Sequence, residues 1–150
     1  MLDQFLWTIV LTAATVALHM VYSYYAFRAM RHRRVRAIPH LGEVPHRVFL
    51  LVSSVVLLLL LHCMETTLWA VYYVKSNSLP DFATALYFSM LSYATIGYGD
   101  IVLPAQERLV GAMEGMVGTM VAGWSVALIV ATLQATGPTR QSGRDTPPPP

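Results

Sequence analysis

Three long apolar runs dominate the chain, at residues 5–27, 48–74 and about 109–135. Each is long enough to cross the apolar core of a bilayer, which takes about 20 helical residues. A fourth apolar segment, residues 79–93, is too short to span and lies between the second and third runs. The pattern predicts an all-α membrane protein with three transmembrane helices and a re-entrant segment before the last of them.

Composition supports this class, because 55% of the 150 residues are hydrophobic and only 12% are charged. A soluble domain of this size cannot bury that much apolar surface. The first run has the length of a secretory signal, but residues 1–4 carry an acid and no lysine or arginine. No small-residue cleavage site follows, so we interpret it as a retained N-terminal transmembrane helix, residues 1–27.

Basic residues gather in the connection at residues 28–47, and an excess of them in a short loop marks the cytoplasmic side. The N-terminus then lies outside the cell membrane, and residues 136–150, with four terminal prolines, form a disordered cytoplasmic tail. Arginines at every third position resemble a voltage sensor, but sensor arginines lie within a membrane segment. Lipid head groups are a second possible contact, and nothing supports nucleic acid binding. The arginines of the connection are Arg28, Arg31, Arg33, Arg34, Arg36 and Arg47.

The segment Thr95-Ile96-Gly97-Tyr98-Gly99-Asp100 follows the short apolar segment directly. Two glycines flank an aromatic residue, and glycine adopts positive φ at little steric cost. Such backbone turns successive carbonyl oxygens toward one axis, where they replace the water around a monovalent cation without adding fixed charge. The motif therefore predicts a cation pathway lined by backbone.

This motif closely resembles the selectivity filter of potassium channels, with Ile96 in place of the usual valine. The resemblance covers about residues 48–135 and implies an outer helix (48–74), a pore helix (79–93), a filter (95–99) and an inner helix (105–135). It implies a tetramer around one pore, with permeant K⁺ bound by carbonyls and no cofactor. The carbonyls are those of Thr95, Ile96, Gly97 and Tyr98, with the Thr95 hydroxyl completing the innermost site.

The resemblance also implies supporting residues around the filter. Ile96 and Tyr98 point away from the pore, and Ser92, Tyr87, Phe88 and Asp100 brace it. Some bacterial relatives carry a pore-helix glutamate that pairs with the aspartate after the filter, where this chain has Leu91. Asp100 must then find another partner, face water or bind a cation. At the start of the pore helix, Ser78 and Asp81 form a capping-box pattern around Pro80.

Several glycines lie within the last apolar run. Small residues four apart let membrane helices pack closely, which suits Gly111 and Gly115. By the resemblance, Gly118 lies near the inner-helix glycine at which related channels bend, and Gly123 is a second hinge candidate.

Two carboxylates, Glu65 and Glu114, lie within membrane helices, where an ionisable group is expensive and a functional candidate. Each lies about nine residues, or roughly 14 Å, from the outer end of its helix. Two interpretations follow: the pair shares a proton behind the pore helix, or each bonds a separate hydroxyl such as that of Thr66, Tyr93 or Ser89.

Polar residues also recur along one face of the first helix, which predicts packing against neighbouring helices, with His19 as a proton sensor the alternative. The metal-ligand types at residues 62–65 occupy adjacent helical positions that do not converge on one ion. The polar stripe consists of Thr8, Thr12, Thr15, His19 and Ser23.

The sequence thus predicts a passive potassium channel subunit, self-assembling in the bilayer, and not an enzyme. No nucleophile, phosphate loop or metal constellation is present. Alternatives are a subunit that tunes other channel chains, a poorly selective cation channel, and a scaffold that uses the proline tail. The gating stimulus and any gating partner are left open.

Overall fold

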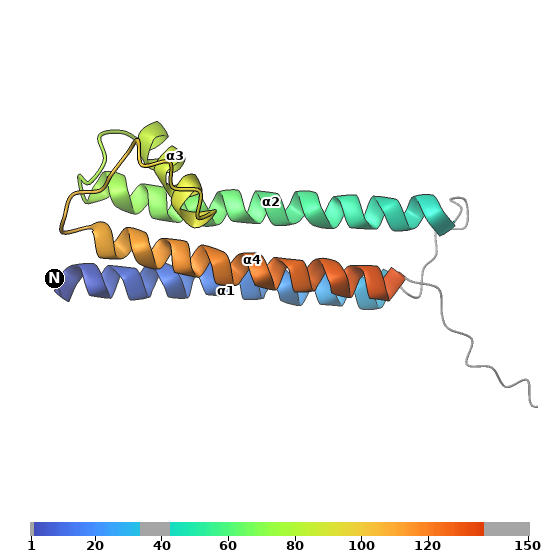
Figure 1. The fold of residues 1–150 in the computed structure, drawn as a ribbon. Coiled ribbons are helices and arrows are strands. Elements are labelled where there is room, and N and C mark those ends of the chain that lie inside the picture. Colours follow the sequence, from blue (N-terminus) through green and yellow to red (C-terminus); the bar gives the residue numbers. More distant parts are fainter. Residues whose placement is uncertain (1, 34–42, 137–150) are drawn as a thin grey trace, which may run out of the picture.

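The computed structural model describes residues 2–33 and 43–136. They form four helices and, within these ranges, no strand: α1 (Leu2–Arg33), α2 (Glu43–Lys75), α3 (Phe82–Tyr93) and α4 (Arg108–Thr136). The three long helices run side by side, and α3 packs obliquely at the end where α2 ends and α4 begins (Figure 1). Residues 94–107 return from the inner end of α3 to the start of α4.

Helices α1 and α2 extend beyond the apolar runs that predicted them, and in α1 the arginine, alanine and methionine after residue 27 continue a helix readily. The predicted loop at 28–47 is therefore mostly helical at its two ends, and residues 34–42 lie outside the described residues. Residues 137–150 of the predicted disordered tail also lie outside them. Helix α4 begins at Arg108, three residues after the predicted start of the inner helix at residue 105.

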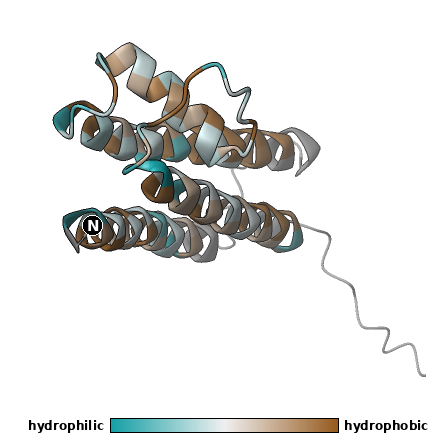
Figure 2. Cartoon of the chain, turned by 60° about the vertical axis from the view of Figure 1, so that its left-hand side comes forward, coloured by the Kyte–Doolittle hydropathy of each residue, from teal (hydrophilic) through white to brown (hydrophobic). Residues whose placement is uncertain are grey.

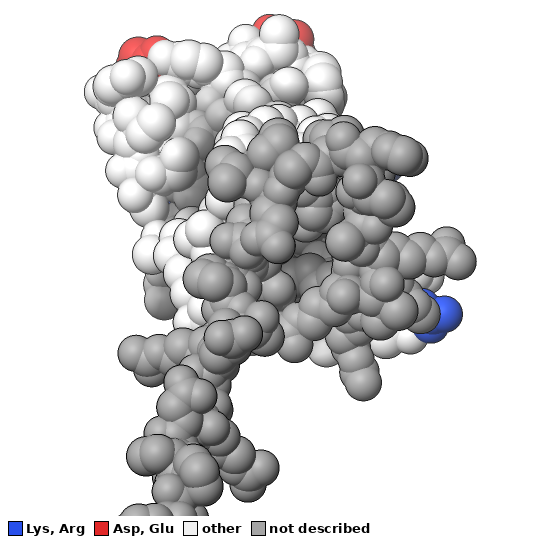
Figure 3. All heavy atoms as spheres, turned by 90° about the vertical axis from the view of Figure 1, so that its right-hand side faces the viewer, with Lys and Arg blue, Asp and Glu red and all other residues white. Residues whose placement is uncertain are grey.

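Three helices are long and apolar enough to cross a membrane, over Asp3–Ala29, Val48–Lys75 and Arg108–Gln134. Hydrophobic residues run along the long helices, and hydrophilic ones gather near their ends and in the connections (Figure 2). In the end-on view, the described surface is mostly uncharged (Figure 3). Large apolar side chains such as Phe5 and Leu59 stay exposed on the outside. The chain is a membrane protein.

The core lies where α3 fits into the angle between α2 and α4. Trp69 and Tyr73 of α2, Ala85 of α3 and Val110 of α4 are fully or almost fully buried in it. Tyr73 also meets Phe88 edge to face, with ring centroids 5.3 Å apart. This packing fixes the position of α3, and with it the start of the segment that contains the glycines.

The polar stripe of α1 faces the other helices, as predicted. Thr8, Thr15, His19 and Ser23 are buried. Thr8 and Ser23 donate to carbonyls four residues earlier, at 2.8 and 2.7 Å, so their hydroxyls are satisfied within the helix. Thr15 instead accepts a hydrogen bond from the indole N–H of Trp69 at 3.1 Å, which ties α1 to α2.

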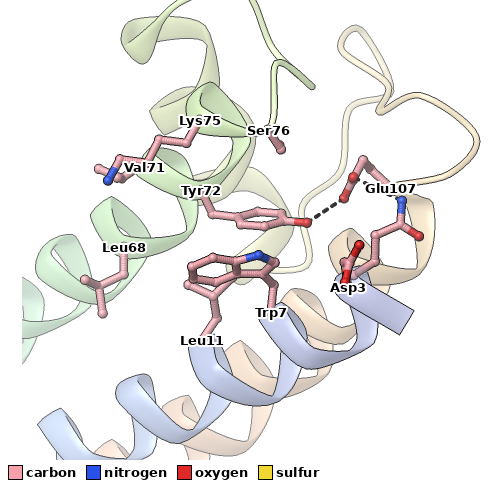
Figure 4. A pocket seen from close by; sticks show the side chains of 10 residues that line it. Asp3, Trp7, Leu11, Leu68, Val71, Tyr72, Lys75, Ser76 and Glu107 are labelled. Atoms are coloured by element: carbon pink, nitrogen blue, oxygen red, sulfur yellow. Dashed lines mark hydrogen bonds between the residues drawn. The ribbon is translucent and has the colours of Figure 1, made fainter. Parts of the chain in front are cut away.

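At the end that holds the N-terminus of α1, an open cavity of about 520 Å³ separates α1 from α2 (Figure 4). The hydroxyl of Tyr72 donates to Glu107 at 2.9 Å, and the side-chain amide of Gln4 donates to the same carboxylate at 3.2 Å. The ring of Trp7 faces that of Tyr72, 6.0 Å away. Glu107 therefore connects both neighbouring helices to the start of α4.

Replacing Trp69 with phenylalanine tests the attachment of α1. The change leaves the buried hydroxyl of Thr15 without its donor, and we expect a loss of about 1–3 kcal/mol in the free energy of unfolding. Thermal unfolding in detergent measures it. Trp7→Phe, at an exposed position, is the matched control and should change stability by less than about 0.5 kcal/mol. Equal effects of the two changes on stability would contradict the role given to the hydrogen bond between Trp69 and Thr15.

Candidate functional site

The helix before the glycine motif begins one turn later than predicted. Asp81 is its N-cap: its backbone is extended, and its carboxylate accepts hydrogen bonds from the amide and hydroxyl of Thr84 at 2.9 and 2.8 Å. The expectation of a capping box starting at Ser78 was wrong. A cap at Ser78 would make Leu79 the first helical residue, but Pro80 disfavours helical backbone in the residue before it.

The hydrogen bond from the Thr84 amide lowers the pKa of Asp81, and the bond from its hydroxyl acts in the same direction. Because the pKa of Asp81 is lower in the folded state, the ionised cap stabilises α3 at pH values above the ordinary pKa of a carboxyl group. That contribution is lost as pH falls through the lowered value. We expect the protection of the first-turn amides of α3 against hydrogen exchange, relative to the intrinsic exchange rate at the same pH, to fall in acid. Asp81→Asn, which keeps an acceptor oxygen, should remove this pH dependence of protection, whereas Asp81→Ala should lower protection at every pH. An unchanged profile in both variants would contradict the role of Asp81 as the cap.

The other end of α3 lies deep along the bundle (Figure 1). Tyr93, its last residue, donates its hydroxyl to Glu65 at 2.8 Å. Glu65 lies ten residues before Lys75, the last residue of α2, which is roughly 15 Å of helix. That depth is about half of a bilayer core roughly 30 Å thick. With 12 residues, α3 therefore starts at one end of the bundle and stops near its middle.

The backbone after α3 alternates in conformation. Thr95, Gly97 and Gly99 have positive φ values of 57°, 50° and 79°, and the residues between them do not. The amides of Ile96 and Gly97 both donate to the carbonyl of Leu91, at 2.8 and 3.3 Å. These amides therefore face the end of α3. Within the described chain, no hydrogen bond reaches the carbonyls of residues 95–99.

The side chains of this segment are exposed in the single chain. Tyr98 is 71% exposed and Ile96 is 51% exposed. The backbone carbonyl of Ser92 accepts a hydrogen bond from the amide of Thr95 at 3.0 Å. The contact of Ser92 with this segment is therefore through its backbone. The segment thus presents free carbonyls and two large apolar side chains that its own chain does not cover.

Asp100 has a partner that the sequence did not single out for it. The hydroxyl of Tyr87 donates to its carboxylate at 3.0 Å, and this bond to an anion raises the pKa of Tyr87. The predicted supporting residues Tyr87 and Asp100 are thus brought together. Phe88 instead packs against Tyr73 and lies near Gly111.

The two buried carboxylates each have their own partners. Tyr73 donates its hydroxyl to Glu114 at 2.7 Å, and Ser89 of α3 donates to the other oxygen of that carboxylate. Glu65 accepts from Tyr93 and contacts two histidines. Both carboxylates are fully buried. The geometry corresponds to the interpretation with separate hydroxyl partners, and no hydrogen bond joins these two carboxylates.

Comparison with protein families decides the class. The sequence model of a family described as ion channel, with a two-helix potassium-channel-type pore domain, matches residues 48–135, more than half of the chain. The chain belongs to this ion channel family. Helix α1 lies before the matched region and is an extra apolar helix. No match is found among curated proteins or among solved structures.

In this channel, Gly118 is a packing position. A Cβ there would lie 2.1 Å from the carbonyl oxygen of Tyr93, so α4 passes directly against the end of α3. Gly115 is also close, 3.2 Å from the carbonyl of Ser92, whereas a Cβ at Gly123 would meet nothing within 4 Å. Gly118 therefore lets α4 approach the backbone just before the glycine segment, and its role as a hinge stays a prediction.

The polar contacts that connect the channel's helices around Glu65 do not follow from the sequence. Residues 62–65 were judged as metal-ligand types, and neither the contact of His62 with Glu65 nor that with Ser125 was predicted. The available signal was the spacing of His62 and Glu65, three residues apart and so on one face of a helix. Nothing in the sequence shows that His19 and Ser125, on other helices, meet that face.

Proposed function

We propose that the chain is a subunit of a potassium-selective channel and that four copies conduct K⁺ passively through residues 95–99. The alternating backbone of Thr95, Gly97 and Gly99 carries the proposal. Because the amides of Ile96 and Gly97 bond back to Leu91, the carbonyls are left for an ion. Carbonyl oxygens bind a monovalent cation strongly enough for entry and weakly enough for release.

The helix before this segment supports the same function. The carboxyl end of α3 carries partial negative charge and lies at mid-depth of the bundle, where a cation needs stabilisation. Neither end turn of α3 contains a basic residue that would cancel this field. Tyr87 and Asp100 tie the far end of the segment back to α3. The segment is therefore held at both of its ends.

Assembly of four copies accounts for what the single chain leaves open. One segment cannot surround an ion, and four loops build such a filter. Tyr98 and Ile96 are large, apolar and exposed, and neighbouring copies would cover them. Met116 and Met120 on α4 are likewise exposed, 61% and 75%. The basic connection sets the orientation, with the N-terminus outside and the C-terminus in the cytoplasm.

Flux from liposomes that contain the purified protein tests the proposal. We expect a K⁺ gradient to drive charge movement, an equal Na⁺ gradient to drive at least about tenfold less, and chemical cross-linking to yield a tetramer. A stable tetramer without flux would favour a subunit that tunes other channel chains. Equal K⁺ and Na⁺ flux would instead establish a poorly selective cation channel. Either result would overturn the proposal.

A further inference from the structure

Two histidines and a carboxylate meet inside the bundle, away from the glycine segment. The Nδ1 atom of His19 on α1 lies 3.1 Å from one oxygen of Glu65, and the Nδ1 atom of His62 lies 2.8 Å from the other. His19 and Glu65 are fully buried, and the side chain of His62 is 22% exposed. We call these three residues the His–Glu–His cluster.

Every helix contributes a neighbour to this cluster. From α3, Tyr93 donates its hydroxyl to Glu65, and from α4 the hydroxyl of Ser125 lies 3.0 Å from Nε2 of His62. Trp124 packs against the ring of His19 with centroids 5.1 Å apart, and Tyr22 of α1 lies beside the same ring. Glu114 bonds Tyr73 and Ser89 instead, so Glu65 is the carboxylate to which both imidazoles bond.

The charge of the cluster depends on one proton. With Glu65 ionised and both imidazoles neutral, the bundle contains an unpaired negative charge, which is costly in an apolar interior. A proton on one imidazole turns the cluster into an ion pair without net charge. Histidine is the side chain that ordinarily gains or loses a proton nearest to neutral pH, so an imidazole is the member of the cluster suited to take this proton.

The two imidazoles are not equivalent as acceptors of that proton. Protonated histidine donates from both ring nitrogens. His62 has an oxygen partner for each, in Glu65 and Ser125. Nε2 of His19 is buried without a hydrogen-bond partner, so a second proton on this ring would bury an unsatisfied N–H. Neutral His19, with its proton on Nδ1, needs only Glu65.

We propose that the His–Glu–His cluster is a proton-binding site, that His62 takes the proton, and that its bond to Ser125 passes the change to α4. In neutral His62, Nε2 accepts from the Ser125 hydroxyl; in protonated His62 it donates to that oxygen. A bond from a charged donor is roughly twice as strong as a neutral one. Acid therefore tightens the tie between α2 and α4 and favours the arrangement seen here.

Nuclear magnetic resonance of ¹⁵N-labelled histidines in nanodiscs tests the site itself and needs no flux. We expect the His62 ring to change from one bound proton to two between about pH 5 and 8, while His19 keeps the neutral Nδ1–H form. His19→Gln and His62→Gln assign the signals. A first proton taken up by His19, or no titration of either ring in this range, overturns the proposal.

Flux tests the coupling, and this part rests on the proposed channel function. We expect K⁺ flux to change as the pH is lowered from about 8 to about 5, and Ser125→Ala and His62→Gln to abolish the change. A variant with His32, His40 and His46 all replaced by glutamine, the other histidines of the chain, is the matched control and should keep it. A pH response that survives Ser125→Ala overturns the coupling. Absence of flux at every pH overturns the channel function instead, and the resonance experiment still decides the site.

Discussion

Gly97→Ala should abolish selectivity for K⁺ over Na⁺. Gly97 has a φ of 50°, and a Cβ there would meet nothing within 4 Å, so conformation and not space opposes alanine. An L-residue in the left-handed region costs about 1–2 kcal/mol, and the proposed tetramer would incur this cost four times around one axis. The segment should relax to an ordinary conformation, and its carbonyls should leave the ion path.

The measurement is the ratio of K⁺ to Na⁺ flux in liposomes, which should fall to near one. Gly123→Ala makes the same exchange at a helical position with open space around it, and selectivity should persist. Undiminished selectivity in Gly97→Ala would contradict both the role of the positive φ and the proposal that residues 95–99 select the ion.

Gly118→Ala should destabilise the fold itself. The added Cβ would lie 2.1 Å from the carbonyl oxygen of Tyr93 and 2.8 Å from its carbonyl carbon. Both are backbone atoms, so no change of rotamer relieves the overlap, and α3 and α4 must move apart. We expect a loss of about 1–3 kcal/mol in the free energy of unfolding, the range for overpacking a membrane or soluble core.

Thermal unfolding in detergent measures this loss. Gly123→Ala is again the control, and it should stabilise α4 by up to about 1 kcal/mol, because alanine is a better helix former than glycine. The experiment separates two roles of Gly118. If it acts only as a hinge, stability stays unchanged while the single-channel open probability falls; a marked loss of stability instead identifies the packing role.

Much of the fold follows from the sequence because it depends on local patterns. Long apolar runs predicted α1, α2 and α4, and an apolar segment too short to span predicted α3. The stripe of threonines, His19 and Ser23 identified the face of α1 that packs inward. The start of α3 was misplaced because Ser78 and Asp81 both suit a cap, and the effect of Pro80 decides between them.

The tertiary contacts of the site could not be predicted in the same way. Glu65 and Glu114 were recognised as unusual, and their depth along the helices suggested a meeting. Which side chain a carboxylate meets depends on the rotation of each helix about its axis, and apolar runs on all sides leave that rotation undetermined. Tyr73 therefore went unnoticed as a partner of Glu114, as did Tyr87 for Asp100.

The attachment of α1 has a consequence for how such a channel could arise or be re-engineered. Glu65 and Trp69 belong to the region matched by the family, yet each directs a polar group to α1, at His19 and Thr15. A chain cut down to that region would expose this face of α2 to hydrocarbon. The indole N–H of Trp69 would then lose its partner, and Glu65 would keep Tyr93 and His62 but lose His19. Residues 48–135 of this protein therefore do not form a unit that can be separated from α1 unchanged. Their transplantation or minimisation would first require an apolar residue without a polar group at position 69 and a replacement for the contact of His19 with Glu65.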